Sequence, residues 1–303
     1  MQSWQKRLNR DPLPWLLDSE NPSVCYWTLT DILDLPGSDS TVQEARAAIA
    51  QRPLVKEIFA LQHPEGHWGD ETKPHTAEGD VGALTLLHML GAAPDQRTAA
   101  GCDSFLKNCQ HTSGGFSMTK KIRSGIFPCT TGEHLRFLVY FGLGNDPRVR
   151  AAFAFTIQSM SADHALDCGR YQHQDCLWGA IAALNGLAVL PMDMRSAQSQ
   201  EVVQRLADRL LDARYDFEGE HKRWLTFGVP RTWDLLSALK ALAAHGYTHD
   251  ARFVPLLKLM LDRQDEQGRW LCGSVSRTWP IEKRNRPSKW VTLDALRILK
   301  LAG

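Results

Sequence analysis

Apolar residues recur at i, i+3 and i+4 spacing through most of the chain, and this pattern predicts helices of two kinds. A helix that is apolar on most faces is buried, whereas a helix with a single apolar stripe lies on the outside. The two kinds alternate along the chain, which predicts helical hairpins, and strand-like alternation is almost absent. Striped helices are expected at residues 43–62, 98–110, 149–160, 202–214 and 253–264, and more apolar helices at residues 23–35, 79–92, 131–144, 175–190, 232–246 and 290–303.

Three of the striped helices end in one short pattern, Q-x-x-x-G-x-[W/F]. The copies are Gln62–Trp68, Gln110–Phe116 and Gln264–Trp270, and the more apolar helices that follow recur about every 50 residues. A fixed period of this length is typical of repeat architectures. We predict an all-α fold, a single (α/α)6-type toroid over residues 1–303, with inner and outer rings of helices around a central cavity. Both chain ends carry inner-type helices, so we expect them to meet; an open array of the same hairpins is the alternative.

The Q-x-x-x-G-x-[W/F] copies resemble the QW-type repeats of the terpenoid cyclase and protein prenyltransferase superfamily. The chain as a whole, including residues 286–293 near its end, resembles bacterial proteins described as prenyltransferase or squalene-oxidase repeat proteins. This resemblance implies the α/α toroid. The D-x-D-D and D-D-x-x-D motifs of terpene cyclases and synthases are missing, as is the D-x-C zinc pair of protein prenyltransferases. The resemblance therefore carries over the fold and not the chemistry.

Composition narrows the classes of partner. Hydrophobic residues make up 43% of the 303-residue chain, and the formal net charge is +1, so no field of one sign attracts nucleic acid or an anionic membrane. No apolar run approaches the length of a membrane span, and the first residues lack a signal-peptide pattern. Seven cysteines are dispersed without a disulfide framework, so we expect a reduced, cytoplasmic protein. The oligomeric state stays open.

Candidate catalytic residues lie at or near the expected starts of the inner helices. In a toroid these helices point the same way, so their first turns line one mouth of the cavity. Helix N-termini lower thiol pKa values, and a carboxyl group in an apolar cavity can act as a general acid or base. The candidates are Asp80, Cys129, Cys176, Asp234 and His173, and the structural alternative is that they are caps or small buried residues.

A second set of residues near the same mouth is expected to contact the substrate. Aromatic walls suit an apolar or cationic molecule, although they equally suit a filled core. This set is Tyr26, Glu78, Trp178, Trp233 and Trp290.

Three cysteines and one histidine form a candidate zinc set, namely Cys129, Cys168, His173 and Cys176. The spacing differs from the common C-x-x-C pair, so buried packing and metal-free thiol chemistry remain alternatives. Apart from this zinc, we expect no cofactor.

The sequence therefore favours an enzyme that acts on a small apolar, isoprenoid-like molecule by Asp/Cys/His acid–base chemistry, as an isomerase, lyase or cyclase. The linalool dehydratase-isomerase toroid is similar in using cavity cysteines for proton transfer. The alternatives are a zinc-binding toroid and a non-catalytic toroid that binds a ligand.

Overall fold

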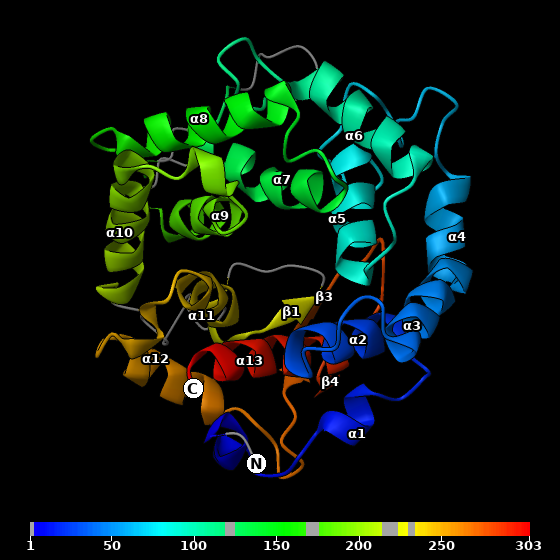
Figure 1. Cartoon of the computed structure of the whole chain (residues 1–303), viewed down its shortest axis with the longest axis vertical. Coiled ribbons are helices and arrows are strands. Elements are labelled where there is room, and N and C mark those ends of the chain that lie inside the picture. Colours follow the sequence, from blue (N-terminus) through cyan, green and yellow to red (C-terminus); the bar gives the residue numbers. More distant parts are fainter. Residues whose placement is uncertain (1–2, 119–124, 168–175, 214–223, 230–233) are drawn as a thin grey trace. The chain divides into compact units, whose positions relative to one another are not determined.

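The computed structural model describes residues 3–118, 125–167, 176–213, 224–229 and 234–303, and these are mostly helical, as expected (Figure 1). Two compact units can be recognised, and each is described by itself. Unit 1 contains Met1–Arg52, Leu90–Ala92 and Arg214–Gly303, and unit 2 contains Pro53–Met89 and Ala93–Ala213. A single toroid over the whole chain stays a prediction. In the described part of the chain, no helix has both the length and the apolar character needed to cross a membrane.

Unit 2 is built from pairs of an outer-type and an inner-type helix. Helix α7 (Pro128–Tyr140) packs against α8 (Pro147–Ser161) and α9 (Leu177–Leu187), and α10 (Ala197–Leu211) packs against α8 and α9 (Figure 1). Eight of the eleven residues of α9 are buried, whereas α10 buries a single stripe that includes Val202, Leu206 and Leu210. The two predicted kinds of helix are therefore present. The elements are α4 (Pro53–Ala60), α5 (Asp80–Leu90), α6 (Gln96–Cys109), α7 (Pro128–Tyr140), α8 (Pro147–Ser161), α9 (Leu177–Leu187), the 3-10 helix η3 (Met192–Met194) and α10 (Ala197–Leu211).

Capping side chains fix where the outer helices begin. Asp95 and Ser196 form capping boxes with Thr98 and Ser199, and Asp146 caps α8, whose first residue is Pro147. Each cap accepts a hydrogen bond from a backbone N–H that has no partner within the helix.

Unit 1 contains the first and last helices of the chain. Helix α13 (Lys289–Leu301) packs against α2 (Pro22–Trp27), the π-helix η2 (Thr28–Ile32) and α11 (Leu235–Ala244), and α11 packs against α12 (Phe253–Leu261). The elements are the 3-10 helix η1 (Ser3–Arg7), α1 (Leu13–Leu16), α2 (Pro22–Trp27), η2 (Thr28–Ile32), α3 (Ser40–Gln51), β1 (Gly228–Val229), α11 (Leu235–Ala244), the 3-10 helix η5 (Tyr247–His249), α12 (Phe253–Leu261), β2 (Leu271–Cys272), β3 (Ser274–Val275), β4 (Arg286–Pro287) and α13 (Lys289–Leu301).

Two expected helices differ in the structure. The helix predicted over residues 43–62 is two helices, because Pro53 has no backbone N–H and Arg52 takes an extended conformation before it. The helix predicted over residues 23–35 changes to π-helix at Thr28 and ends at Ile32, two residues before Asp34, whose φ is 55°. The near absence of strands is confirmed for the described residues, which contain only two-residue strands: β1 pairs with β3 in parallel and β2 pairs with β4 antiparallel.

The two chain ends meet within unit 1, as the sequence predicted. The Ser3 hydroxyl donates a hydrogen bond to the Gly303 carbonyl. The backbone N–H of Asn9 donates to Gln264 Oε1 at 2.9 Å, and Gln264 Nε2 donates to the Arg7 carbonyl at 3.0 Å. The N-terminal segment therefore lies against the last Q-x-x-x-G-x-W copy.

Candidate functional site

The three copies of the repeat pattern share one local structure, which organises the surrounding helix starts. In the first two copies the glutamine amide donates both to the glycine carbonyl of its own turn and to a carbonyl near the start of the following outer helix. Each glycine has a positive φ and lies against backbone atoms, so a side chain does not fit there. The pairs are Gln62 with Gly66 and Arg97 (2.8 and 2.9 Å), and Gln110 with Gly114 and Arg148 (2.9 and 2.6 Å).

Asp80, a candidate catalytic residue, occupies a position that two other repeats fill with threonine. Its carboxylate accepts the Trp68 backbone N–H at 2.7 Å, just as Thr131 accepts the N–H of Phe116 at 2.9 Å and Thr292 that of Trp270 at 3.0 Å. Asp80 therefore has a structural task in the repeat. Only at this one of the three positions is the acceptor able to carry a charge.

The carboxyl group of Asp80 is almost completely buried, with 1% of the residue exposed. Burial raises its pKa to about 6, although hydrogen bonds from Trp68 and Ser104 and the charge of His67 act in the opposite direction. A carboxyl group with this pKa is mostly ionised at pH 7 and carries a larger neutral fraction than an ordinary aspartate does. Whether it acts in catalysis stays a prediction.

Asp234 begins α11, and its carboxylate is occupied by backbone donors. Oδ1 accepts the Ser237 N–H at 2.8 Å in an N-cap, and Oδ2 accepts the Gly228 N–H at 3.2 Å. These bonds match the capping alternative that the sequence left open.

Cys129 and Cys176 come together at the starts of α7 and α9. Their Cβ atoms lie 3.8 and 3.7 Å from the position that a Cβ atom on Gly179 would occupy, and the Leu166 side chain lies 3.5 Å from the same point. Both cysteines are half-buried, whereas Cys102 and Cys109 are fully buried in α6, where desolvation raises their thiol pKa values. The pair combines proximity, partial exposure and a position at helix N-termini.

Two glycines set the distance between these helices. A Cβ atom on Gly186 of α9 would lie 2.3 Å from the Gly132 carbonyl oxygen of α7. We expect Gly186→Ala to lower the free energy of unfolding by about 1–3 kcal/mol, because the helices must move apart to admit the methyl group. Urea unfolding measures the change, with Gly144→Ala as control, since the nearest atom to its added Cβ lies 3.8 Å away. Equal stability of the two variants would contradict this close approach.

The residues expected to contact a substrate have different surroundings. Tyr26 and Trp290 are buried in unit 1, and the Tyr26 hydroxyl accepts a hydrogen bond from Arg46 at 3.0 Å. Trp178 is half-buried in the first turn of α9, two residues after Cys176, and Glu78 is exposed in the turn before α5. Trp233 lies outside the described residues.

The candidate zinc set is only partly described. Cys129 and Cys176 are neighbours, but Cys168 and His173 lie outside the described residues. The set of four therefore stays a prediction.

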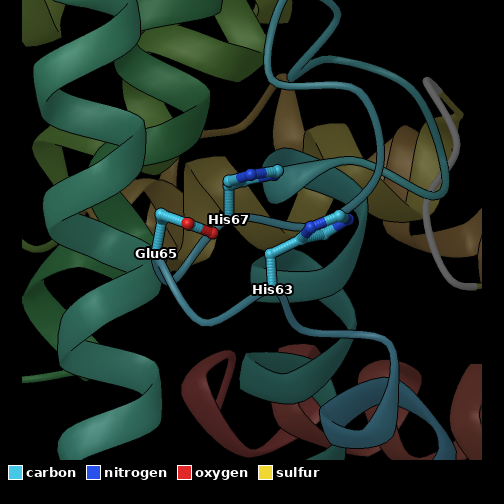
Figure 2. Close-up of side chains that lie close together, drawn as sticks. All are labelled: His63, Glu65 and His67. Carbon is cyan, nitrogen blue, oxygen red and sulfur yellow. The ribbon is translucent and has the colours of Figure 1, made fainter.

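Two polar groups were not expected from the sequence. One is a chain of ion pairs in unit 1, in which Arg297 contacts both Asp31 and Asp294, and Lys240 also contacts Asp294. Burial raises the pKa of Asp294, but the charges of Lys240 and Arg297 outweigh burial and lower that pKa to about 2. In unit 2, the imidazoles of His63 and His67 and the carboxylate of Glu65 gather on the turn of the first repeat, and Figure 2 shows the carboxylate directed toward His67. The pattern H-x-E-x-H could have identified the histidine and glutamate group from the sequence. The chain of ion pairs has no local sequence pattern, because Asp31 and Arg297 are 266 residues apart.

No family model matches the sequence, and no curated protein shows significant similarity to it. Among solved structures, the chain is similar to a protein from Actinoplanes with 16% identity, covering 93% of this chain and 90% of that one at a TM-score of 0.50. A variant of the type II terpene cyclase MstE from Scytonema, in complex with geranylgeranyl dihydroxybenzoate, gives 15% identity, coverage of 93% and 87%, and a TM-score of 0.49. At this identity the likeness to the Actinoplanes protein concerns the fold alone.

Proposed function

We propose that the chain is an enzyme that acts on a small apolar, isoprenoid-like molecule by acid–base chemistry, as an isomerase, lyase or cyclase. The observation that carries the proposal is the proximity of Cys129 and Cys176 at the starts of two adjacent inner-type helices. The isoprenoid class comes from the resemblance of the repeats to those of terpenoid cyclases.

The pair suits proton transfer between two positions of one substrate. The partial positive charge at a helix N-terminus stabilises a thiolate, which accepts a proton, while a second thiol in its neutral form donates one. Cys129 is the second residue of α7 and Cys176 is the N-cap of α9, so both lie in this field. Leu166 and the half-buried Trp178 supply apolar surroundings for the substrate.

In this proposal Asp80 and Asp234 have structural roles and do not transfer protons. Both carboxylates accept backbone hydrogen bonds that hold the repeat or a helix start. Asp80→Asn and Asp234→Asn are therefore expected to alter stability more than turnover. His173 remains a candidate partner of the thiols.

Turnover of a panel of terpene alcohols tests the proposal. Loss of a general acid or base lowers rates about 10²–10⁴-fold, and we expect this for Cys129→Ala and for Cys176→Ala. Cys25→Ala is the matched control, because Cys25 is also a half-buried thiol in an inner-type helix, α2, and we expect it to keep full activity. Unchanged turnover in both variants, or no turnover of any alcohol by the wild type, would contradict the proposal.

The same proximity favours a second candidate function, zinc binding by Cys129 and Cys176 with Cys168 and His173. Metal analysis of the purified chain separates the two. One equivalent of zinc that disappears in Cys129→Ala supports the zinc site, and less than about one tenth of an equivalent rejects it.

A further inference from the structure

The turn of the first repeat differs from its two counterparts in side chains and not in backbone. In all three turns the first residue donates its N–H to the carbonyl of the fifth, and the glycine donates its N–H to the carbonyl of the first. The first bond measures 2.8 Å from His63 to His67, 2.9 Å from His111 to Gly115 and 2.8 Å from Asp265 to Arg269. Because three different side-chain sets support the same backbone, the turn itself does not require histidine or glutamate at these positions.

In the other two turns the side chain of the first residue stabilises its own turn. His111 Nδ1 accepts the Ser113 N–H at 3.1 Å, and an Asp265 carboxylate oxygen accepts the N–H groups of Gln267 and Arg269 at 2.8 and 2.9 Å. These interactions account for the polar side chains that begin both turns.

In the first turn, by contrast, the side chains of His63, Glu65 and His67 make no hydrogen bond or ion pair with any residue that the structure describes. His67 Nδ1 is buried and has no partner among those residues. A buried ring nitrogen without a partner costs free energy, and coordination of an ion by that nitrogen would remove the cost.

The three side chains converge at this turn. One ligand atom from each lies within 4.8 Å of the other two, and the two imidazole rings are stacked with their centres 4.2 Å apart and 15° between their planes (Figure 2). His63 and Glu65 are exposed and His67 is half-buried, so an ion can reach them. The buried carboxylate of Asp80 interacts electrostatically with His67 and adds negative charge near it.

We propose that His63, Glu65 and His67 bind a divalent transition-metal ion of the zinc class. Two imidazoles and one carboxylate suit zinc and its neighbours, whereas magnesium and calcium prefer oxygen ligands alone. Bonds of about 2.1 Å in tetrahedral coordination separate ligand atoms by about 3.4 Å, so small rotations of exposed side chains complete the set. Three protein ligands leave one position for water or another exchangeable ligand.

Titration of the metal-free full chain with zinc in an isothermal calorimeter tests the proposal. We expect one equivalent to bind at this turn and the double substitution Glu65→Ser, His67→Gly to remove that binding. These are the residues of the second repeat, so the turn backbone is expected to survive, and circular dichroism checks the fold. The single variant His63→Gln is expected to weaken binding by more than about tenfold, whereas His111→Ala, in the second turn, leaves it unchanged.

Cobalt distinguishes this site from the cysteine pair of the proposed function. Cobalt at the turn is expected to give no thiolate charge-transfer absorption, and the Cys129→Ala, Cys176→Ala double variant is expected to keep the binding. The proposal is overturned if less than about one tenth of an equivalent binds, if affinity changes less than about twofold in the turn variants, or if binding disappears with the two cysteines. None of these results bears on the activity of the thiols.

Discussion

Trp68→Ala is expected to lower the free energy of unfolding by about 3–5 kcal/mol, the range for removing a large aromatic side chain from a core. Trp68 is 1% exposed, and its ring fills the space against Gly101, where a Cβ atom would lie 2.3 Å from the ring. Its indole N–H donates to the Ile58 carbonyl at 2.7 Å, which ties the turn to helix α4. Urea unfolding, analysed with one m value for both proteins, measures the loss of unfolding free energy.

The chain supplies the control for this prediction. Phe116 occupies the same place in the second copy without an indole N–H, and it is fully buried. We therefore expect Trp68→Phe to cost about 1–3 kcal/mol, mainly because the Ile58 carbonyl loses its donor, and to remain folded. A cost for Trp68→Phe as large as that for Trp68→Ala would show that the hydrogen bond, and not ring packing, dominates at this position.

Helix starts were predictable because their signals are local. Three of the more apolar helices were expected to begin near residues 79, 175 and 290, and they begin at Asp80, Leu177 and Lys289. At α13 the polar residue Ser288 caps the first turn from the adjacent position, so the apolar pattern and the cap lie within a few residues of each other. The glycine of each repeat turn was predictable for the same reason.

The acceptor that holds the aromatic residue of each repeat was not predictable. It lies 12 residues after the aromatic in the first copy, 15 in the second and 22 in the third, and it is aspartate once and threonine twice. A partner at variable distance and of variable type leaves no pattern in a single sequence. For this reason the sequence marked Asp80 as a candidate catalytic acid but did not show that it accepts the backbone hydrogen bond of the repeat.

The candidate thiols show an intermediate case. The repeat placed Cys129 and Cys176 near the starts of two of the more apolar helices, and they lie at the starts of α7 and α9, which the glycine contact brings together. That contact depends on Gly132 and Gly186, which the sequence presents as isolated glycines within helices. Proximity of the thiols thus followed from the repeat, while its physical cause followed only from the structure.

Asp80→Asn is expected to stabilise the chain by up to about 3 kcal/mol above pH 7 and to leave its stability unchanged near pH 4. The pKa of Asp80 rises from 3.8 to about 6 on folding, mainly through burial, so the folded state binds the proton more tightly than the unfolded state does. Charging the buried carboxyl therefore costs stability as pH rises from about 4 to about 6, and a difference of about two pKa units corresponds to about 3 kcal/mol. Asparagine keeps the acceptor for Trp68 and removes the charge.

Urea unfolding of both proteins between pH 4 and pH 8, with a chelator present to exclude metal at the neighbouring turn, gives the difference directly. Asp80→Thr extends the test, because Thr131 and Thr292 already accept the same hydrogen bond without a charge. We expect it to follow Asp80→Asn in its dependence on pH. A difference from wild type that does not vary with pH would mean that Asp80 titrates alike in the folded and unfolded chain. A gain above pH 7 would instead show that the charge at this one repeat is retained at the expense of stability, because threonine accepts the same backbone hydrogen bond in the other two repeats without a charge.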